Sequence, residues 1–329
     1  MTDRSTPDAS VVIVSFNTRD LLRECLTDLH RQQDLSFETL VVDNASRDGS
    51  ADMVEAEFPM VRLIRETVNL GFAAANNVAF PLARGRYVVL LNSDAFLQAG
   101  ALAQAAGLMD AHPRTGIGGG RLVGRDGSWQ PAARMSPSVL NDFLTLTGLA
   151  AKYPRSRFFG RADRTWSDPL QAASVDWITG AFLMIRAEAL SRIGYFDERF
   201  FLYYEEVDLC RRFRAAGYEV SYWPGIVVVH LGGESSKTVE HLSMSRTGAQ
   251  IALWRMRAEF LYYRKHHGAQ AWLAKQSESN WHRLRRWKNS GSADPVRKRK
   301  FEDSTTTIRL LDQAWRETQG GRISPARPW

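Results

Sequence analysis

The first hundred residues alternate between short apolar runs and segments with helical spacing. The β-branched run 10–17 predicts a buried strand, and in 18–32 apolar side chains recur at helical intervals behind Thr18, a candidate N-cap. The alternation continues, with strands expected near 37–46, 61–66 and 86–95 and helices near 48–58 and 71–83. This order of elements predicts an α/β fold with a mixed, mainly parallel sheet flanked by helices.

The pattern changes twice further along the chain. Periodicity fades over 124–172, which we interpret as long loops around a short helix, typical of segments that cover a substrate. A strand pair and a helix start are expected over 174–190, followed by a strand at 218–224 and the apolar run 225–230. Beyond about 240 the spacing is that of amphipathic helices. We therefore expect two parts, 1–240 and 241–329.

The net charge of +7 is concentrated in the second part. Residues 251–329 contain 17 Lys and Arg against 7 Asp and Glu, which leaves the first 250 residues at −3. Within residues 251–288, seven aromatic residues stand among many Lys and Arg: Trp254, Phe260, Tyr262, Tyr263, Trp272, Trp281 and Trp287. Two roles fit this composition, docking on a membrane surface or packing against the first part or a second subunit. Nucleic-acid binding would depend on the basic tail alone, and we do not expect it.

Several classes of protein are disfavoured. No run of about 18 apolar residues predicts a membrane-spanning helix, and the N-terminus lacks the apolar core of a signal peptide. The two cysteines, Cys25 and Cys210, fall in separate predicted helices, so we expect no disulfide and a cytoplasmic protein. The glycine-rich stretch 116–121 lacks dinucleotide-binding spacing, and no Walker A sequence is present.

Polar residues collect directly after the predicted strands, where ligands bind in open parallel sheets. Asp94 follows a buried strand and could bind Mg²⁺ or Mn²⁺, although an ordinary Asn/Asp turn is an equal alternative. Asp43 could accept a hydrogen bond from the N–H of a uracil or thymine, or belong to a helix-capping loop with Ser46 or Asp48. A nucleotide site at this edge is one interpretation of the pattern.

Two further residues have a functional and a structural interpretation. Gly71 lies with Asn69 at a helix start, and it either lets the backbone approach a ligand or serves helix packing. His230 ends the apolar run 225–230 and is either a metal ligand or a hydrogen-bonded histidine at a strand end.

The stretch FFLYYEEVDLCRR, residues 200–212, places three carboxylates beside apolar surface. In a helix that begins near Glu205, Glu206 shares a stripe with Cys210 and Phe213, whereas Asp208 lies near arginines. Burial on that stripe would raise the pKa of Glu206 toward the range of a general base. The helix dipole explains the acids at 205 and 208 equally well, but not the one at 206.

Six motifs in this order resemble the inverting glycosyltransferases of family 2, which have the GT-A fold, over roughly residues 9–235. They are VVIVSFN, VVDNASRDGS, NLGFAAANN, LLNSD, WITGAFLMIRAEAL and GYFDERFFLYYEEVDLCRRFRAAGY. The likeness is greatest to bacterial rhamnosyltransferases of polysaccharide assembly. It implies a nucleotide-sugar-dependent catalytic domain at 1–240 and a basic, aromatic-rich helical extension at 241–329.

The resemblance also implies roles for residues. Donor nucleotide binding falls to Phe16, Asn17, Asp43, Asn69, Gly71, Asn92 and Ser93. Metal binding (Mg²⁺ or Mn²⁺) falls to Asp94 and His230, the catalytic base is Glu206 with Glu205 as the alternative, and the acceptor pocket contains Trp177, Gly180, Tyr203 and Tyr204. Two positions depart from the family pattern: Asn92 replaces the first aspartate of Asp-x-Asp, and Glu206 replaces the usual aspartate of a Glu-Asp pair.

The expected reaction is transfer of L-rhamnose from dTDP-rhamnose to a glycan or lipid-linked saccharide in cell-surface polysaccharide synthesis, at the inner face of the plasma membrane. A UDP-hexose, UDP-N-acetylhexosamine or UDP-galactofuranose donor is the enzymatic alternative. An inactive nucleotide-sugar-binding protein is the alternative from another class.

Overall fold

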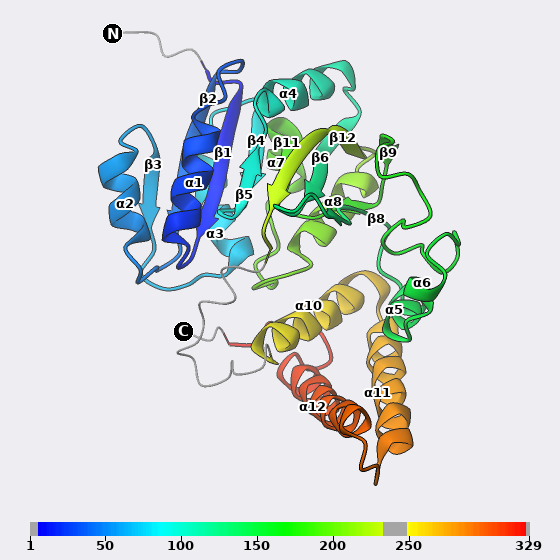
Figure 1. Cartoon of the computed structure of the whole chain (residues 1–329). Coiled ribbons are helices and arrows are strands. Elements are labelled where there is room, and N and C mark those ends of the chain that lie inside the picture. The colour runs from blue at the N-terminus through cyan, green and yellow to red at the C-terminus, as the bar shows by residue number, and fades with distance from the viewer. Residues whose placement is uncertain (1–5, 233–248, 327–329) are drawn as a thin grey trace.

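In this computed structural model, which describes residues 6–232 and 249–326, a twisted mixed sheet forms the centre of the molecule (Figure 1). Within that part of the chain the strand order is β3-β2-β1-β4-β11-β6-β12-β5, with β7 paired to β6 and β9 paired to β12, while β8 and β10 form a separate small sheet. The strands are β1 (Ala9–Ser15), β2 (Phe37–Asp43), β3 (Arg62–Arg65), β4 (Tyr87–Leu91), β5 (Ala95–Leu97), β6 (Thr115–Val123), β7 (Trp129–Gln130), β8 (Ala133–Arg134), β9 (Ala173–Ser174), β10 (Trp177–Ile178), β11 (Phe182–Arg186) and β12 (Glu219–His230).

Helices cover this sheet and continue into a C-terminal bundle. The helices of the first part are α1 (Arg19–Leu29), α2 (Ser50–Glu57), α3 (Phe72–Ala79), the 3-10 turn η1 (Phe80–Leu82), α4 (Ala101–Ala111), α5 (Val139–Leu146), α6 (Leu149–Lys152), α7 (Ala187–Ile193) and α8 (Glu205–Ala215). The bundle consists of α10 (Ala249–His267), α11 (Gln270–Asn289) and α12 (Pro295–Glu317), gathered below the sheet beside α5 (Figure 1). The expected α/β fold is confirmed, and residues 249–326 contain helices without strands.

The sheet departs from the predicted strands at two places. The segment 86–95 contains β4 followed by a polar turn, as expected, but a further short strand, β5, begins at Ala95 and pairs with β12. The two strands expected over 218–230 are the single strand β12, with a register shift between Trp223 and Val227. The neighbouring glycines of β6 explain its tight packing, since a Cβ at Gly118 would lie 1.8 Å from the Trp223 ring. The glycine run therefore serves sheet packing.

Thr18 occupies the predicted N-cap position of α1 but does not cap it. Its hydroxyl donates to Ser93 Oγ at 2.9 Å and lies 3.0 Å from Ser15 Oγ. These buried contacts join the ends of β1 and β4. The residue thus ties two strand ends together where side-chain capping was expected.

Most of the aromatic residues of α10 pack inward. Phe260, Tyr262 and Tyr263 are fully buried, and the Trp254 ring lies 4.4 Å from the ring of Phe201. By contrast Trp272 and Trp287 of α11 are 52% and 71% exposed. The packing interpretation therefore accounts for α10, and within residues 249–326 the exposed tryptophans are the two on α11. The boundary expected at 240 lies outside the described residues.

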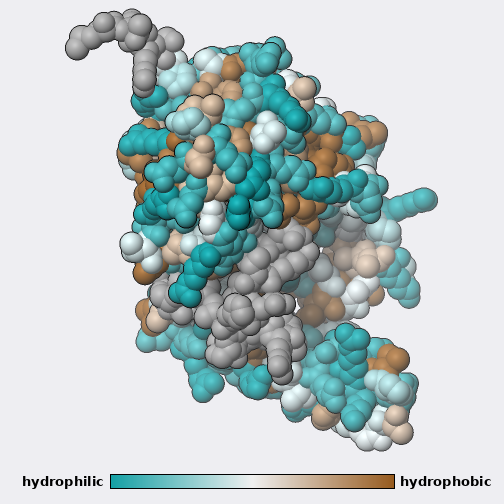
Figure 2. Space-filling view, turned by 60° about the vertical axis from the view of Figure 1, so that its left-hand side comes forward, coloured by the Kyte–Doolittle hydropathy of each residue, from teal (hydrophilic) through white to brown (hydrophobic). Residues whose placement is uncertain are grey.

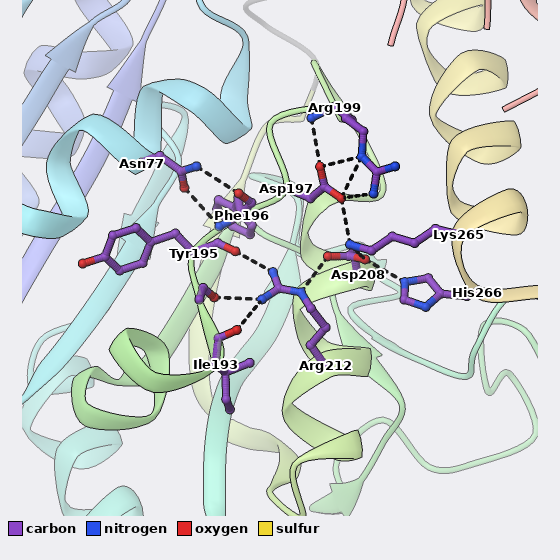
Figure 3. A network of polar contacts seen from close by, with 11 residues as sticks. Asn77, Ile193, Tyr195, Phe196, Asp197, Arg199, Asp208, Arg212, Lys265 and His266 are labelled. Carbon is purple, nitrogen blue, oxygen red and sulfur yellow. Dashed lines mark hydrogen bonds and ion pairs between the residues drawn. The ribbon is translucent and has the colours of Figure 1, made fainter. Parts of the chain in front are cut away.

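A charged network fixes α10 against α8 (Figure 3). The carboxylate of Asp208, which has no exposed surface, contacts Lys265 at 2.6 Å and His266 at 2.7 Å on one oxygen and Arg212 at 2.8 Å on the other. Lys265 also reaches Asp197 at 2.8 Å. Burial opposes ionisation of Asp208, but its hydrogen bonds with His266 and Lys265 prevail and lower its pKa. The helix that begins at Glu205 is thereby held against the C-terminal bundle.

The described helices include none long and apolar enough to cross a membrane. The face of the molecule in Figure 2 is mainly hydrophilic, and its hydrophobic residues stand in small groups.

Candidate active site

A cavity of about 1050 Å³ lies between the strand ends and the C-terminal helices. Its walls include Asp94, His230, Glu205 and Glu206 from the first part of the chain. Side chains of α10 and α11 complete it, so the cavity is shared by both parts of the chain. Its volume is at the upper end for small-molecule sites, enough for more than one small ligand.

Asp94 and His230 meet on one side of this cavity. Pairing of β5 with β12 sets Ala95 opposite His230, and the histidine Nε2 atom lies 3.6 Å from Asp94 Oδ1. Both residues are less than a tenth exposed. Burial lowers the pKa of His230 despite the opposing effect of the Asp94 charge, which favours the neutral imidazole that metals bind.

Gln130 fixes the orientation of this imidazole. Its amide Nε2 donates to the His230 carbonyl at 2.8 Å, so its Oε1 faces the ring and accepts from Nδ1 at 3.1 Å. The Nε2 lone pair is then free to face Asp94, and Asn92 Nδ2 lies 3.4 Å from that nitrogen. This is the support that a metal-binding histidine usually has. Sequence inspection missed Gln130 because it lies in a segment predicted to be loop, one hundred positions from His230, whereas the structure places it in β7.

These donors fit a divalent cation that also binds a substrate. No group of three or more His, Cys, Asp or Glu residues suited to a metal occurs in the described part of the chain. A carboxylate and a neutral imidazole suffice, however, when phosphate oxygens and waters supply the remaining positions, as in many Mg²⁺ and Mn²⁺ sites. Asp94 and His230 would hold such an ion.

Glu205 and Glu206 enter the cavity at the start of α8 from a strained turn. The two preceding residues, Tyr203 and Tyr204, have φ angles of 71° and 67°, a left-handed conformation that is costly for tyrosine. This turn aims both carboxylates at the cavity, and one oxygen of each, Oε2, has no hydrogen-bond partner. Strain of this kind, together with unpaired buried oxygens, is typical of functional sites.

The two glutamates differ in their surroundings. Burial raises the pKa of both, and the charge of Glu206 raises that of Glu205 well above its usual range. For Glu206, the Gly180 N–H and the charge of Arg134 oppose the effect of burial. When one proton is shared by such a pair, Glu205 is the better place for the proton and Glu206 for the negative charge.

The nucleotide-binding candidates divide into two groups. Phe16, Asn69, Gly71, Asn92 and Ser93 line the cavity. Asn17 and Asp43 do not. Asn17 Oδ1 accepts from Arg47 N at 2.8 Å, and Asp43 Oδ2 accepts from Ser46 N at 3.1 Å.

Asp43 nevertheless retains binding capacity. It is 4% exposed at the end of β2, and its Oδ1 atom is buried without a partner. Burial raises its pKa, although the hydrogen bond with Ser46 opposes this effect. A buried unpaired acceptor at a strand end suits an N–H donor.

Asn69 and Gly71 have structural partners. Asn69 Oδ1 accepts from Asn44 Nδ2 and from Gly71 N, both at 2.9 Å. A Cβ at Gly71, where φ is 81°, would lie 2.4 Å from the Phe201 carbonyl oxygen. The close approach expected at Gly71 is thus made by the Phe201 backbone, as the packing interpretation holds.

All four acceptor candidates, Trp177, Gly180, Tyr203 and Tyr204, line the cavity. Arg134 stacks its guanidinium over the Trp177 ring at 5.2 Å, and Trp177 Nε1 donates to the Met135 carbonyl at 3.0 Å. Sequence inspection missed Arg134. It also missed four cavity residues beyond the tyrosines, namely Asp142, Arg255, Glu259 and Glu278. The sequence offered one signal for this group, because Glu259 stands inside the otherwise apolar run 258–263.

Comparison with known proteins shows which proteins this chain is similar to. A model of glycosyl transferase family 2 matches residues 10–194. The N-acetylglucosaminyl-diphospho-decaprenol L-rhamnosyltransferase of Mycobacterium tuberculosis is 29% identical over 256 residues, which cover 74% of this chain and 83% of that protein. The rhamnosyltransferase WbbL of Escherichia coli is 33% identical over 64 residues, covering 20% of this chain and 24% of WbbL.

Two solved structures share the fold. S. aureus TarS 1-349 has a TM-score of 0.50 and 16% identity, with 95% of this chain and 92% of that chain covered. GalNAc-T7 with UDP, GalNAc and Mn²⁺ has a TM-score of 0.58 and 12% identity, with 98% and 59% covered.

Proposed function

Because this chain belongs to glycosyl transferase family 2, we propose that it is a metal-dependent, inverting enzyme that moves L-rhamnose from dTDP-rhamnose to a lipid-linked saccharide. The observation that carries this proposal is the single cavity that brings Glu206 together with Asp94 and His230. The relative named as an L-rhamnosyltransferase on a diphospho-decaprenol-linked sugar supports the choice of donor and acceptor.

Glu206 acts as the general base in this proposal. Its unpaired Oε2 takes the proton of an acceptor hydroxyl, while the more deeply buried Glu205 stays protonated beside it. The hydroxyl oxygen attacks the anomeric carbon of the donor from the face opposite the diphosphate. The bond between that carbon and the diphosphate oxygen breaks, so the configuration inverts.

The donor lies along the strand ends. The buried Oδ1 of Asp43 accepts the N–H of the base, and the Asn44–Asn69 contact keeps the adjoining loop in place. A divalent cation held by Asp94 and His230 would stabilise negative charge on the departing diphosphate. Trp177 and Tyr203 wall the acceptor side and keep water from the reacting atoms.

A membrane-bound acceptor also gives the exposed surface of α11 a role. Trp272 and Trp287 are exposed there among arginines and lysines, a combination that favours the headgroup region of anionic bilayers. We include peripheral docking on the inner face of the plasma membrane in the proposal. Dimerisation through the same helices is the competing role.

A panel of dTDP- and UDP-sugars, assayed with Mn²⁺ for binding by calorimetry and for donor hydrolysis, tests the function. We expect saturable binding and slow hydrolysis of dTDP-rhamnose. Tighter binding of UDP than of dTDP would replace the donor with a UDP-sugar. Binding without any hydrolysis or transfer, in the presence of a saccharide acceptor, would indicate an inactive nucleotide-sugar-binding protein.

A further inference from the structure

The cavity extends past the reacting groups onto α5, α10 and α11. Its far wall carries Asp142, Arg255, Glu259 and Glu278, none of which has a part in the mechanism above. Tyr203 and Tyr204, which directly precede the glutamates in the chain, line the same space. A second group of polar side chains thus faces the cavity on the acceptor side.

Three of these side chains have no hydrogen bond or ion pair within the part of the chain that the structure describes. Glu259 is only 8% exposed, yet within residues 6–232 and 249–326 its carboxylate has neither a hydrogen bond nor an ion pair. The same holds for the side chains of Arg255 and Glu278 in that part of the chain. Asp142 differs, because it accepts a hydrogen bond from the Tyr263 hydroxyl. Glu259 is therefore a nearly buried carboxylate that lines the cavity without a partner in the described part of the chain, which is costly without a ligand, whereas Arg255 is exposed.

The charges of this wall are close to balance near neutral pH. Burial raises the pKa of Asp142 to about 6 and that of Glu278 to about 7, and the Arg255 charge opposes both shifts. Burial and the charge of Glu278 raise the pKa of Glu259 well above its usual range. The ionised carboxyl groups of this wall would repel an anionic ligand, and the positive charge of Arg255 is the only charge of this group that opposes the repulsion. The wall therefore suits an uncharged ligand with many hydroxyl groups better than a phosphate.

We propose that Arg255, Glu259 and Glu278 form the subsite for the acceptor sugar, an uncharged saccharide unit whose hydroxyl or acyl oxygens they hydrogen-bond. This proposal rests on the proposed function. Carboxyl groups accept from sugar hydroxyls and the guanidinium donates to sugar oxygens, while the tyrosines offer ring faces. The C-terminal helices then select the acceptor, and the strand ends bind the donor.

The test uses the full chain and three variants. Glu259→Gln and Glu278→Gln remove one carboxyl each with little change of shape, and Glu302→Gln is the control because Glu302 is exposed on α12. For each protein, dTDP binding and donor hydrolysis report on the proposed function. Binding of the uncharged methyl glycoside of N-acetylglucosamine, followed by saturation-transfer NMR, reports on the subsite, with inorganic phosphate as competitor.

We expect the two cavity variants to weaken glycoside binding roughly ten- to a hundredfold, with dTDP binding and the control unchanged. Wild-type protein that binds neither dTDP nor any nucleotide sugar would overturn the proposed function itself. If dTDP binds but the glycoside does not, or if the cavity variants bind it as tightly as wild type, the subsite is wrong. Displacement of the glycoside by phosphate would also overturn it, in favour of an anion site. Equal losses of dTDP and glycoside binding would assign the residues a structural role.

Discussion

The Nζ atom of Lys265 lies 2.6 Å from Oδ1 of Asp208, and this ion pair joins α10 to the helix that begins with Glu205. Asp208 was expected to be neutralised by neighbouring arginines. Arg212 does contact it, but Lys265 and His266 of the C-terminal bundle contribute as much (Figure 3). One buried carboxylate therefore holds α8 against α10, the helix that carries Arg255 and Glu259.

Replacement of Asp208 should destabilise the whole chain. Asp208→Asn leaves Arg212, Lys265 and His266 without their shared carboxylate partner, and we expect a loss of about 3–5 kcal/mol in urea unfolding at pH 7. Because the pKa of Asp208 is lowered in the folded protein, its contribution is present above the unfolded value of 3.8 and is lost as pH falls through the folded value. The difference between variant and wild type should shrink below about pH 4.

The matched control for that measurement is Asp20→Asn. Asp20 pairs with Arg23 but is 88% exposed, so its loss should cost less than about 1 kcal/mol. Equal effects of the two substitutions would show that the Asp208 network does not hold the bundle.

Glu278 should make the protein less stable as pH rises. Its folded pKa of about 7 exceeds the ordinary 4.5, so between these values the folded state binds more protons than the unfolded state. The contribution of Glu278 to the free energy of unfolding is fully present below pH 4.5 and is lost progressively as the pH rises to about 7. Relative to wild type, Glu278→Gln should gain on the order of 1–3 kcal/mol between pH 4.5 and 8 in urea unfolding. If the difference in unfolding free energy between Glu278→Gln and wild type stays constant over that pH range, the pKa of Glu278 is not raised in the folded protein.

Glu206 and Glu205 should respond differently to amidation. Glu206→Gln removes the proposed base and should lower kcat roughly 10²–10⁴-fold while donor binding persists. Glu205→Gln replaces a carboxyl that we expect to be protonated, and it should be the milder change. Steady-state kinetics with both variants decides the order. If Glu205→Gln proves more damaging, the base is Glu205.

Gln130 should matter for metal binding without touching the metal. Gln130→Leu frees the His230 ring and should weaken Mn²⁺ affinity roughly ten- to a hundredfold in calorimetry. Asp94→Ala should abolish metal-dependent turnover with the fold retained, and EDTA should have the same effect on wild type. Full turnover of Asp94→Ala would remove Asp94 from the metal site.

Membrane docking is best tested on the intact chain. A chain ending near 245 would lose one wall of the cavity and uncover Phe201, so it cannot isolate the role of the surface. The double variant Trp272→Ala/Trp287→Ala changes only exposed rings, and it should float less with anionic liposomes than wild type. Wild-type flotation should also fall with added salt. If wild type fails to float, α11 is a packing or dimerisation surface.

The order of strands and helices was predictable because it depends on local patterns. Apolar runs such as 10–17 and the helix starting at Glu205 arise from residues close in the chain. The stripe with Cys210 and Phe213 indicated a raised pKa at Glu206, and burial of its carboxyl group does raise it, but the residue as a whole is only half-buried and Glu205 and Asp208 are the more buried acids. The seven aromatics of the tail were harder to interpret, because their composition is the same whether a ring faces solvent or the catalytic domain.

The sequence by itself thus determined the α/β alternation, the three acids at the start of α8 and the family. Tertiary structure decided which distant residues meet. His230 faces Asp94 because β5 leaves β4 and pairs with β12, and Glu259 faces the cavity because Lys265, further along α10, is held by Asp208. Periodicity records which side of an element is apolar. It contains no information on which element covers that side, since the pairing depends on contacts between residues far apart in the chain, as for Ala95 with His230 and Lys265 with Asp208.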